Sequence, residues 1–124
     1  MKLSALAFLA SLSVLCMSAL AHPPESWQVI FPDGNDDLFC TEKVRLLECG
    51  TSKTTVRLPR TGRPRVLNHG PTRARPPFEV TYLAFGQRWR HDEWRCVDRR
   101  SGLTCRNRDG HGFWFGYPRG LRVF

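Results

Sequence analysis

Four cysteines in two equally spaced pairs are the feature that most limits how this chain can fold. Cys40 and Cys49 are separated by eight residues, and Cys96 and Cys105 are separated by the same number. Four cysteines allow three pairings, and loop entropy does not choose among them, because crossed pairs would close longer loops and stabilise the fold more. The matched spacing favours Cys40–Cys49 and Cys96–Cys105, each closing a ring worth roughly 2–3 kcal/mol. The spacing therefore predicts two cysteine-bridged hairpins, since paired residues of adjacent strands lie close enough to bond.

The first 21 residues have the features of a secretory signal peptide. Lys2 supplies a positive charge, Leu3 to Leu15 form an apolar run too short to span a membrane, and Ala19-Leu20-Ala21 is a suitable cleavage site. The fifth cysteine, Cys16, lies within this segment. We therefore expect a single mature domain of residues 22–124, secreted or periplasmic, in an oxidising compartment where disulfides form.

Short runs of strand-forming residues between turn signals predict that the mature chain is all-β. No run after residue 22 has the spacing of an amphipathic helix. We therefore expect a small, disulfide-stapled antiparallel β domain built on the two cysteine-bridged hairpins. The expected strands cover residues 27–31, 38–41, 46–49, 54–58, 78–85, 94–97, 103–107, 113–115 and 121–124.

A segment rich in arginine and proline, at about residues 59–77, interrupts this pattern. Residues 51–77 contain seven basic residues, five prolines and no acidic residue. Residues 54–58 are expected to form an edge strand that ends at Pro59, and residues 60–77 a long loop without a strand. Loops of this length in a compact domain are usually functional or disordered, so a binding loop and a mobile, solvated loop both remain open.

The charge of the chain is strongly positive and comes mainly from arginine. The formal net charge is +8, and the expected cleavage removes one lysine and no acidic residue, which leaves +7. Arginine outnumbers lysine, and its planar fork binds phosphate and carboxylate through two hydrogen bonds. Basic and aromatic side chains together suit acidic polymers, although arginines also serve simply to keep a surface soluble. The candidate binding residues are Arg60, Arg63, Arg65, Arg73, Arg75, His111 and Trp114, and a second basic group comprises Arg95, Arg99, Arg100, Arg106 and Arg108.

Two histidines are candidates for chemistry. His111 lies between Gly110 and Gly112, where it could present its ring to a substrate or a metal, or simply occupy a glycine turn. His91 and Glu93 would share one face if they lay on a strand and would then supply two metal ligands, but no further cluster completes such a site.

Two other metal sites are weakly indicated. Asp33, Asn35 and Asp37 match the start of a calcium loop, but Leu38 stands where the loop needs its glycine, so calcium of that type is rejected. After cleavage His22 would be the N-terminus, where its amine and ring can chelate copper. Such a site needs a second imidazole, from His69 or His111, and nothing in the sequence positions one. We therefore predict no metal and no cofactor.

The C-terminal part of the chain carries a recurring set of short motifs: residues 83–87 (LAFGQ), 94–96 (WRC), 101–107 (SGLTCRN), 110–113 (GHGF) and 123–124 (VF). This set resembles a bacterial secreted family that is catalogued only as a domain of unknown function. Gly34-Asn35, Cys40 and Cys49 are more loosely similar to it, and residues 51–77 show no similarity. The resemblance implies secretion and disulfides, and it implies no activity.

These observations favour a non-catalytic binding module. Its expected partner is an acidic envelope component, such as a polysaccharide or a lipid headgroup, or another protein. Nucleic acid is disfavoured because the chain leaves the cytoplasm, and no phosphate-binding loop, nucleophile motif or acid/base carboxylate pair indicates an enzyme. The alternative is a small hydrolase or metal-binding protein centred on His111, which would require His111, His91 and an acidic side chain to meet in one pocket.

Overall fold

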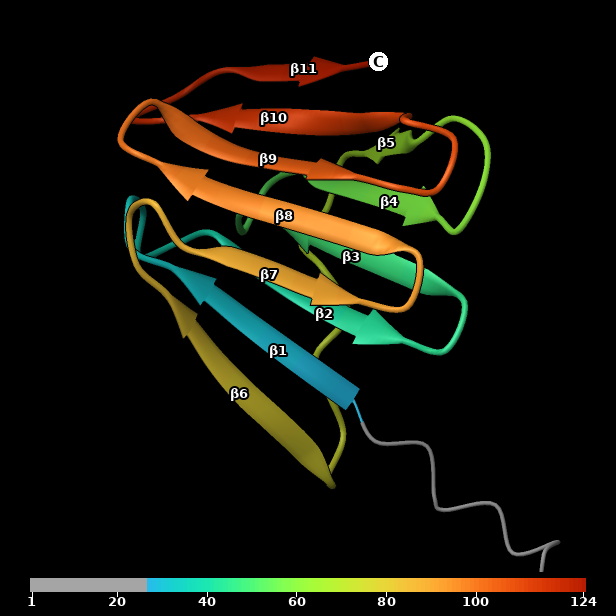
Figure 1. Cartoon of the computed structure of the whole chain (residues 1–124). Helices are drawn as coiled ribbons and strands as arrows, with labels where there is room; N and C mark the ends of the chain where they lie inside the picture. The colour runs from blue at the N-terminus through green and yellow to red at the C-terminus, as the bar shows by residue number, and fades with distance from the viewer. Residues whose placement is uncertain (1–26) are drawn as a thin grey trace, which may run out of the picture.

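The computed structural model describes residues 27–124 (Figure 1). The expected signal peptide and His22 lie outside these residues. The described chain consists of strands and turns, and it contains no helix that could span a membrane. The strands are β1 (Trp27–Pro32), β2 (Phe39–Lys43), β3 (Leu46–Gly50), β4 (Thr55–Pro59), β5 (Arg65–Leu67), β6 (Phe78–Leu83), β7 (Arg88–His91), β8 (Trp94–Arg99), β9 (Gly102–Arg106), β10 (Gly112–Gly116) and β11 (Leu121–Val123).

The strands form two sheets that stack as a sandwich (Figure 1). Sheet A has six strands in the order β5-β4-β3-β2-β1-β6, and sheet B has five in the order β11-β10-β9-β8-β7. Every pairing is antiparallel except β1 with β6, which is parallel. The all-β, mainly antiparallel prediction is confirmed.

The two disulfides lie together in the middle of the sandwich. Cys40 pairs with Cys49 across β2 and β3, and Cys96 pairs with Cys105 across β8 and β9. All four are buried, and the sulfur atoms of Cys40, Cys49 and Cys105 lie within 4.8 Å of one another. The predicted pairing is confirmed, and the two hairpins face each other across the core.

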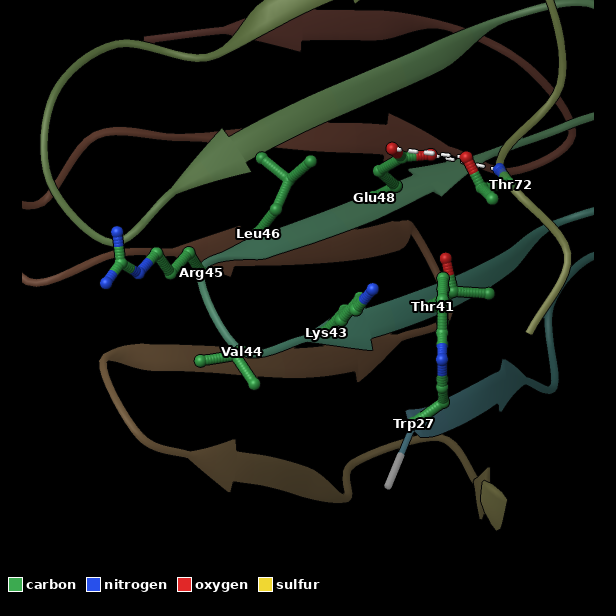
Figure 2. Close-up of a pocket in the computed structure, with 8 residues that line it drawn as sticks. All are labelled: Trp27, Thr41, Lys43, Val44, Arg45, Leu46, Glu48 and Thr72. Atoms are coloured by element: carbon green, nitrogen blue, oxygen red, sulfur yellow. Dashed lines mark hydrogen bonds between the residues drawn. The ribbon is translucent and has the colours of Figure 1, made fainter. Parts of the chain in front are cut away.

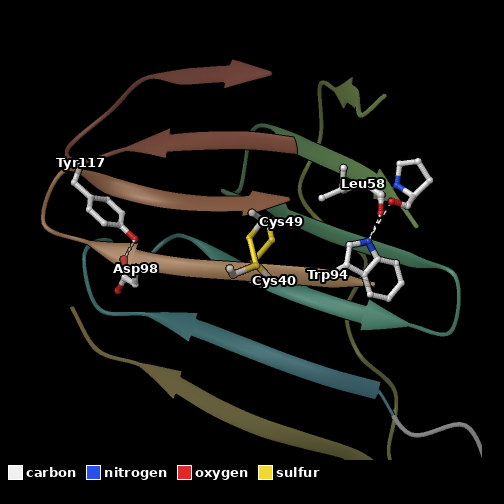
Figure 3. Close-up of a disulfide and its surroundings, with 9 residues drawn as sticks. Cys40, Cys49, Leu58, Trp94, Asp98 and Tyr117 are labelled. Atoms are coloured by element: carbon white, nitrogen blue, oxygen red, sulfur yellow. Dashed lines mark hydrogen bonds between the residues drawn. A yellow bond between two sulfur atoms is a disulfide. The ribbon is translucent and has the colours of Figure 1, made fainter. Parts of the chain in front are cut away.

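Polar contacts tie the two sheets together on either side of the disulfides (Figure 3). The indole of the fully buried Trp94 in β8 donates to the carbonyl oxygens of Leu58 (3.1 Å) and Pro59 (3.2 Å) in β4. At the opposite end of β8, the carboxylate of buried Asp98 accepts a hydrogen bond of 2.7 Å from the Tyr117 hydroxyl and one of 3.0 Å from the Asp33 backbone N–H. The core is therefore closed at both ends by hydrogen-bonded side chains, as buried polar groups require.

The connection from β5 to β6, residues 68–77, is a strap across sheet A. Because β5 and β6 lie at opposite edges of this sheet, their connection must cross the strands between them. It runs over the face away from sheet B, where the Thr72 N–H donates to Glu48 Oε2 at 2.9 Å and Thr55 Oγ1 donates to the His69 carbonyl. At its end the Trp27 N–H donates to the Pro77 carbonyl at 3.2 Å.

Two sequence expectations about this region are wrong. Residues 60–77 contain a strand, β5, and β4 is therefore an interior strand and not an edge strand. The apolar part of β5 is only Val66-Leu67, between arginine and asparagine, which is too short to show an alternating pattern. Pairing with β4 supplies the order that the local sequence does not indicate.

Candidate anion-binding face

The outer face of sheet B is covered by arginine. In β8, Trp94, Cys96 and Asp98 point inward and are buried, whereas the alternate residues Arg95 and Arg99 are exposed on the outer face. The strand register extends this alternation to the neighbouring strands, and no strand residue on the outer face is acidic. The residues that we call the basic face are the exposed Arg88, Arg90, Arg95, Arg99, Arg106 and Arg122, together with Trp114.

Three of these arginines form a ladder across adjacent strands. Arg90 is the direct partner of Arg95, and Arg95 is the direct partner of Arg106. Like charges directly opposite one another destabilise a sheet. The ion pairs found within residues 27–124 are Arg57–Glu48, Arg60–Asp92 and His91–Glu42, so no carboxylate of the described chain neutralises the ladder. A row of like charges without counter-charges lowers the stability of a sheet, and destabilising features of this kind are expected at functional sites.

A depression of about 410 Å³ lies over the ladder. It is bounded by Arg88, Arg90, Arg95 and Arg106, and its floor includes Val97 and Thr104. Guanidinium groups therefore surround a small apolar and hydroxyl-bearing floor. The guanidinium groups can bind an anionic group of a ligand while adjacent atoms of that ligand contact the floor of the depression.

Trp114 lies flat on the basic face, because glycines leave room for its ring. A Cβ at Gly102 or Gly116 would run into the indole, and Gly102 also has a φ of +154°. The Arg122 guanidinium lies over the ring at 5.4 Å from its centroid. Arg106 lies over the Phe124 ring in the same way, at 4.7 Å. Cation–π contacts of this kind position guanidinium groups and leave their N–H groups free to bind an anion.

The candidate arginines of residues 59–77 do not join the basic face. Arg60 pairs with Asp92 and lies over the Trp94 ring at 6.0 Å, so it closes the end of the core. The other four are exposed. Arg63 follows β4, Arg65 pairs with Arg57 in sheet A, and Arg73 and Arg75 lie in the strap.

The two candidate histidines lie apart. His111 is in the turn between β9 and β10. Its backbone N–H donates to Asn107 Oδ1 at 3.1 Å, and its backbone carbonyl accepts from the Asn107 backbone N–H at 2.8 Å. His91 ends β7, and its Nδ1 lies 3.0 Å from Oε1 of the buried Glu42 in sheet A. Strands β8 and β9 lie between the two. Glu93 lies beyond the end of β7, so it does not share a strand face with His91.

No metal-binding cluster connects these histidines in residues 27–124. The one group of three potential ligands found there is Cys40, Cys49 and Cys105, and all three sulfur atoms are already in disulfides. The structure therefore gives the alternative centred on His111 no converging partners.

A second depression, of about 430 Å³, lies on the outer face of sheet A beside the strap (Figure 2). Its one acidic group, Glu48, is already engaged. Glu48 accepts hydrogen bonds from Arg57 Nε at 3.0 Å and from the Thr72 N–H at 2.9 Å, and Lys43 lies 5.3 Å from the centroid of the Trp27 ring. The basic face differs in that no acidic strand residue lies among its arginines and none of them pairs with a carboxylate of the described chain, and this makes it the stronger candidate.

Sequence reasoning found part of the basic face. Trp114 was among the candidate residues, and Arg95, Arg99 and Arg106 were in the second basic group. Arg88, Arg90 and Arg122 were missed. The signal that would have found the first two is the alternation Arg88-Trp89-Arg90, with the tryptophan inside and the arginines outside.

These features define a disulfide-linked β-sandwich with one basic outer face. The chain belongs to the Family of unknown function (DUF6636), whose sequence profile matches residues 57–123. The match includes β5, the strap and all of sheet B. The expectation that residues 51–77 show no similarity to the family is therefore wrong for residues 57–77. No curated protein and no solved structure matches the chain.

Proposed function

We propose that the protein is an exported, non-catalytic module that binds closely spaced anionic groups through the basic face. The observation that carries this proposal is the Arg90–Arg95–Arg106 ladder, which is exposed and has no carboxylate partner in the described chain. An anionic ligand would remove the like-charge repulsion of the ladder, so binding and sheet stability would be coupled.

The geometry of the ladder indicates the kind of ligand. Paired positions on adjacent strands have Cβ atoms about 4.5–5.5 Å apart, so the guanidinium groups can contact successive charges of a regular array. Acidic polysaccharides and anionic lipid headgroups both present such arrays, through carboxylates or phosphates that arginine binds in a bidentate manner. Trp114 adds a flat, half-buried ring that can contact a sugar or lie at a lipid interface.

The two disulfides in the core are consistent with export of the protein. Two buried disulfides are compatible with an extracellular or periplasmic location, where they form and persist. The apolar run and cleavage site at the start of the chain support the same location. In that location the available polyanions are envelope components, and nucleic acid is scarce.

The experiment compares two triple variants that carry the same change in charge. Arg90→Ser/Arg95→Ser/Arg106→Ser removes the ladder, whereas Arg63→Ser/Arg65→Ser/Arg75→Ser removes three exposed arginines elsewhere. Binding is measured by titration with polygalacturonate and, separately, with phosphatidylglycerol vesicles against phosphatidylcholine vesicles, at several salt concentrations. At about 1 kcal/mol per arginine near an anionic surface, the ladder variant should bind roughly 100-fold more weakly.

Salt should weaken wild-type binding, and the ladder variant should show a shallower salt dependence, because it releases fewer counterions. The control variant should bind almost as tightly as the wild type. The two probes decide between a polysaccharide and a lipid surface. Equal losses in the two variants would show that net charge, and not the basic face, determines binding, and absence of salt-dependent binding to either probe would refute the proposal.

A further inference from the structure

Strand β6 is an unprotected edge. The four edge strands of the sandwich are β5, β6, β7 and β11, and β6 is the longest of them, with six residues. Exposed edges of soluble proteins are usually protected by charge, proline or short length. β7 carries Arg88 and Arg90, and β5 and β11 have three residues each. β6 contains no proline and is longer than these strands, and its one charged residue, Glu79, lies on the opposite face from Phe78, Val80 and Tyr82.

The side chains of β6 are unusually exposed and apolar. Phe78, Val80 and Tyr82 share the outer face of sheet A and are 45%, 42% and 75% exposed. Tyr82 stacks on Phe31 of β1 with ring centroids 5.6 Å apart, so the apolar row continues onto the sheet. On the other face of β6, Glu79 is exposed as well, because β6 extends past the edge of sheet B (Figure 1). Apolar rows of this kind mark contact surfaces.

The backbone of β6 offers free hydrogen-bonding groups along the same edge. The carbonyls of Pro77 and Leu83 accept from Trp27 and Asp33, so odd-numbered residues of β6 point toward β1. Successive residues of a strand point their backbone groups in opposite directions. The N–H and C=O groups of Phe78, Val80 and Tyr82 therefore point outward from the sheet.

We infer that β6 pairs with β6 of a second copy of this chain, in antiparallel register centred on Val80. This register places Val80 opposite Val80 and Phe78 opposite Tyr82, and the outward groups of these residues then face their counterparts. On the opposite face Glu79 meets Thr81, so no like charges oppose one another. The strand is thus complementary to itself, which is what a two-fold interface requires.

The dimer places the two basic faces on the same side. The two-fold axis of an antiparallel pair runs perpendicular to the sheet, so the two copies of sheet A join into one sheet and both copies of sheet B lie on one side of it. Both basic faces then point in the same direction. This consequence rests on the proposed function, because only an extended anionic ligand or surface benefits from two such faces at once.

Sedimentation of the exported protein tests the pairing, with Val80→Lys as the disrupting variant. Two lysines would face each other across the axis, so this variant should be monomeric. It should still fold, because Val80 is 42% exposed. Val66→Lys is the matched control, since Val66 is 46% exposed on the other edge strand of sheet A, and it should stay dimeric. A monomeric wild type would overturn the proposal, and so would a wild type whose β6 pairs with a strand of another protein instead of a second copy. A dimeric Val80→Lys variant would also overturn it.

A cysteine substitution tests the register independently of stability. Directly opposed, hydrogen-bonded residues have Cα atoms about 5.5 Å apart, within disulfide range. Val80→Cys should therefore form a covalent dimer on oxidation, whereas Phe78→Cys should not, because its counterpart is Tyr82. A covalent dimer of the Phe78→Cys variant, with Val80→Cys remaining uncoupled, would contradict the register.

The two proposals fail in distinguishable ways. If both hold, Val80→Lys should bind long polygalacturonate on the order of 100-fold more weakly than the wild type but bind trigalacturonate equally well. A dimeric wild type that binds neither polygalacturonate nor phosphatidylglycerol vesicles would leave the pairing intact and refute the proposed function. If the wild type is dimeric and Val80→Lys binds long polygalacturonate as tightly as the wild type does, the two basic faces do not bind the polymer together.

Discussion

Trp94 joins the two sheets more directly than any other side chain described above. It is fully buried in β8, and its indole N–H is the donor to the Leu58 and Pro59 carbonyls of β4 (Figure 3). A tryptophan at this place buries a large apolar surface and also donates hydrogen bonds to carbonyl groups at the end of β4. Asn107 shares the second of these carbonyls, donating to Pro59 at 3.1 Å.

Replacing this residue should therefore be costly. Trp94→Phe leaves a cavity and removes the donor to β4, and we expect the free energy of unfolding to fall by about 2–4 kcal/mol. Urea denaturation under non-reducing conditions measures this loss. Trp114→Phe on the outer face should cost about 1 kcal/mol or less. Equal losses in the two variants would contradict the structural role given to Trp94.

Glu42 is the buried carboxyl that should govern how stability depends on pH. Burial raises the pKa of Glu42 above its ordinary value of 4.5, and the attraction of His91 and its hydrogen bond lower the pKa only in part. Asp92 raises this pKa further and Arg60 opposes it. Because the folded chain holds the proton more tightly, this group makes folding less favourable as pH rises from 4.5 through the raised pKa.

Glu42→Gln should remove that decline, because glutamine does not ionise. The unfolding free energy of the variant relative to the wild type should therefore increase as the pH rises from 4.5 through the raised pKa of Glu42. Denaturant titrations at a series of pH values measure the difference. Glu79→Gln, which changes an exposed carboxyl, serves as the control and should leave the profile of the wild type unchanged. A variant that loses stability relative to the wild type as pH rises would reverse the predicted sign.

Among the elements, the strap is the one that the sequence describes least well. Its arginines and prolines predicted a long loop, either a binding loop or a mobile one, without contacts to the sheet. Its backbone instead forms hydrogen bonds with Glu48, Thr55 and Trp27 across sheet A. These partners are distant in sequence, so no local pattern could reveal them. The two cysteine hairpins were predictable for the opposite reason, because each disulfide closes a short segment whose spacing is visible in the chain.

The contact between Glu48 and Thr72 should control how often the strap opens. Glu48→Ala removes the acceptor for the Thr72 N–H (Figure 2). It also removes the acceptor for Arg57 Nε. Loss of about 1–2 kcal/mol of local stability should speed tryptic cleavage after Arg73 roughly tenfold. Mass spectrometry of a native digest measures the rate. Glu79→Ala should cleave as slowly as the wild type, and an unchanged rate in Glu48→Ala would show that other contacts hold the strap.

For the whole molecule, the positive charge was predictable and its arrangement was only partly so. Composition indicates a basic protein, and the candidate arginines were sought where basic residues are most concentrated in sequence. The structure instead gathers exposed arginines from β7, β8, β9 and β11 on one face of sheet B. Strand pairing brings these residues together, and pairing depends on contacts over long sequence separations that alternation within one strand does not specify.

The parallel pairing of β6 with β1 is likewise a property of the whole chain. It requires the strap to cross the sheet, and it leaves a long apolar strand at an edge. Neighbouring strands in the sequence usually pair antiparallel, so the sequence favoured an antiparallel sheet throughout. The exposed edge and the basic face both follow from the way the two sheets are assembled.

The most direct test of the account is to map which arginines a polyanion protects. Phenylglyoxal modifies accessible arginines, and mass spectrometry of the exported protein, free and bound to polygalacturonate or phosphatidylglycerol vesicles, gives the reactivity of each one. We predict that Arg90, Arg95 and Arg106 become protected on binding. Four other exposed arginines, namely Arg63, Arg65, Arg73 and Arg75, should react as they do in the free protein. Protection of these four, with the ladder left reactive, would contradict the assignment of the basic face as the binding site.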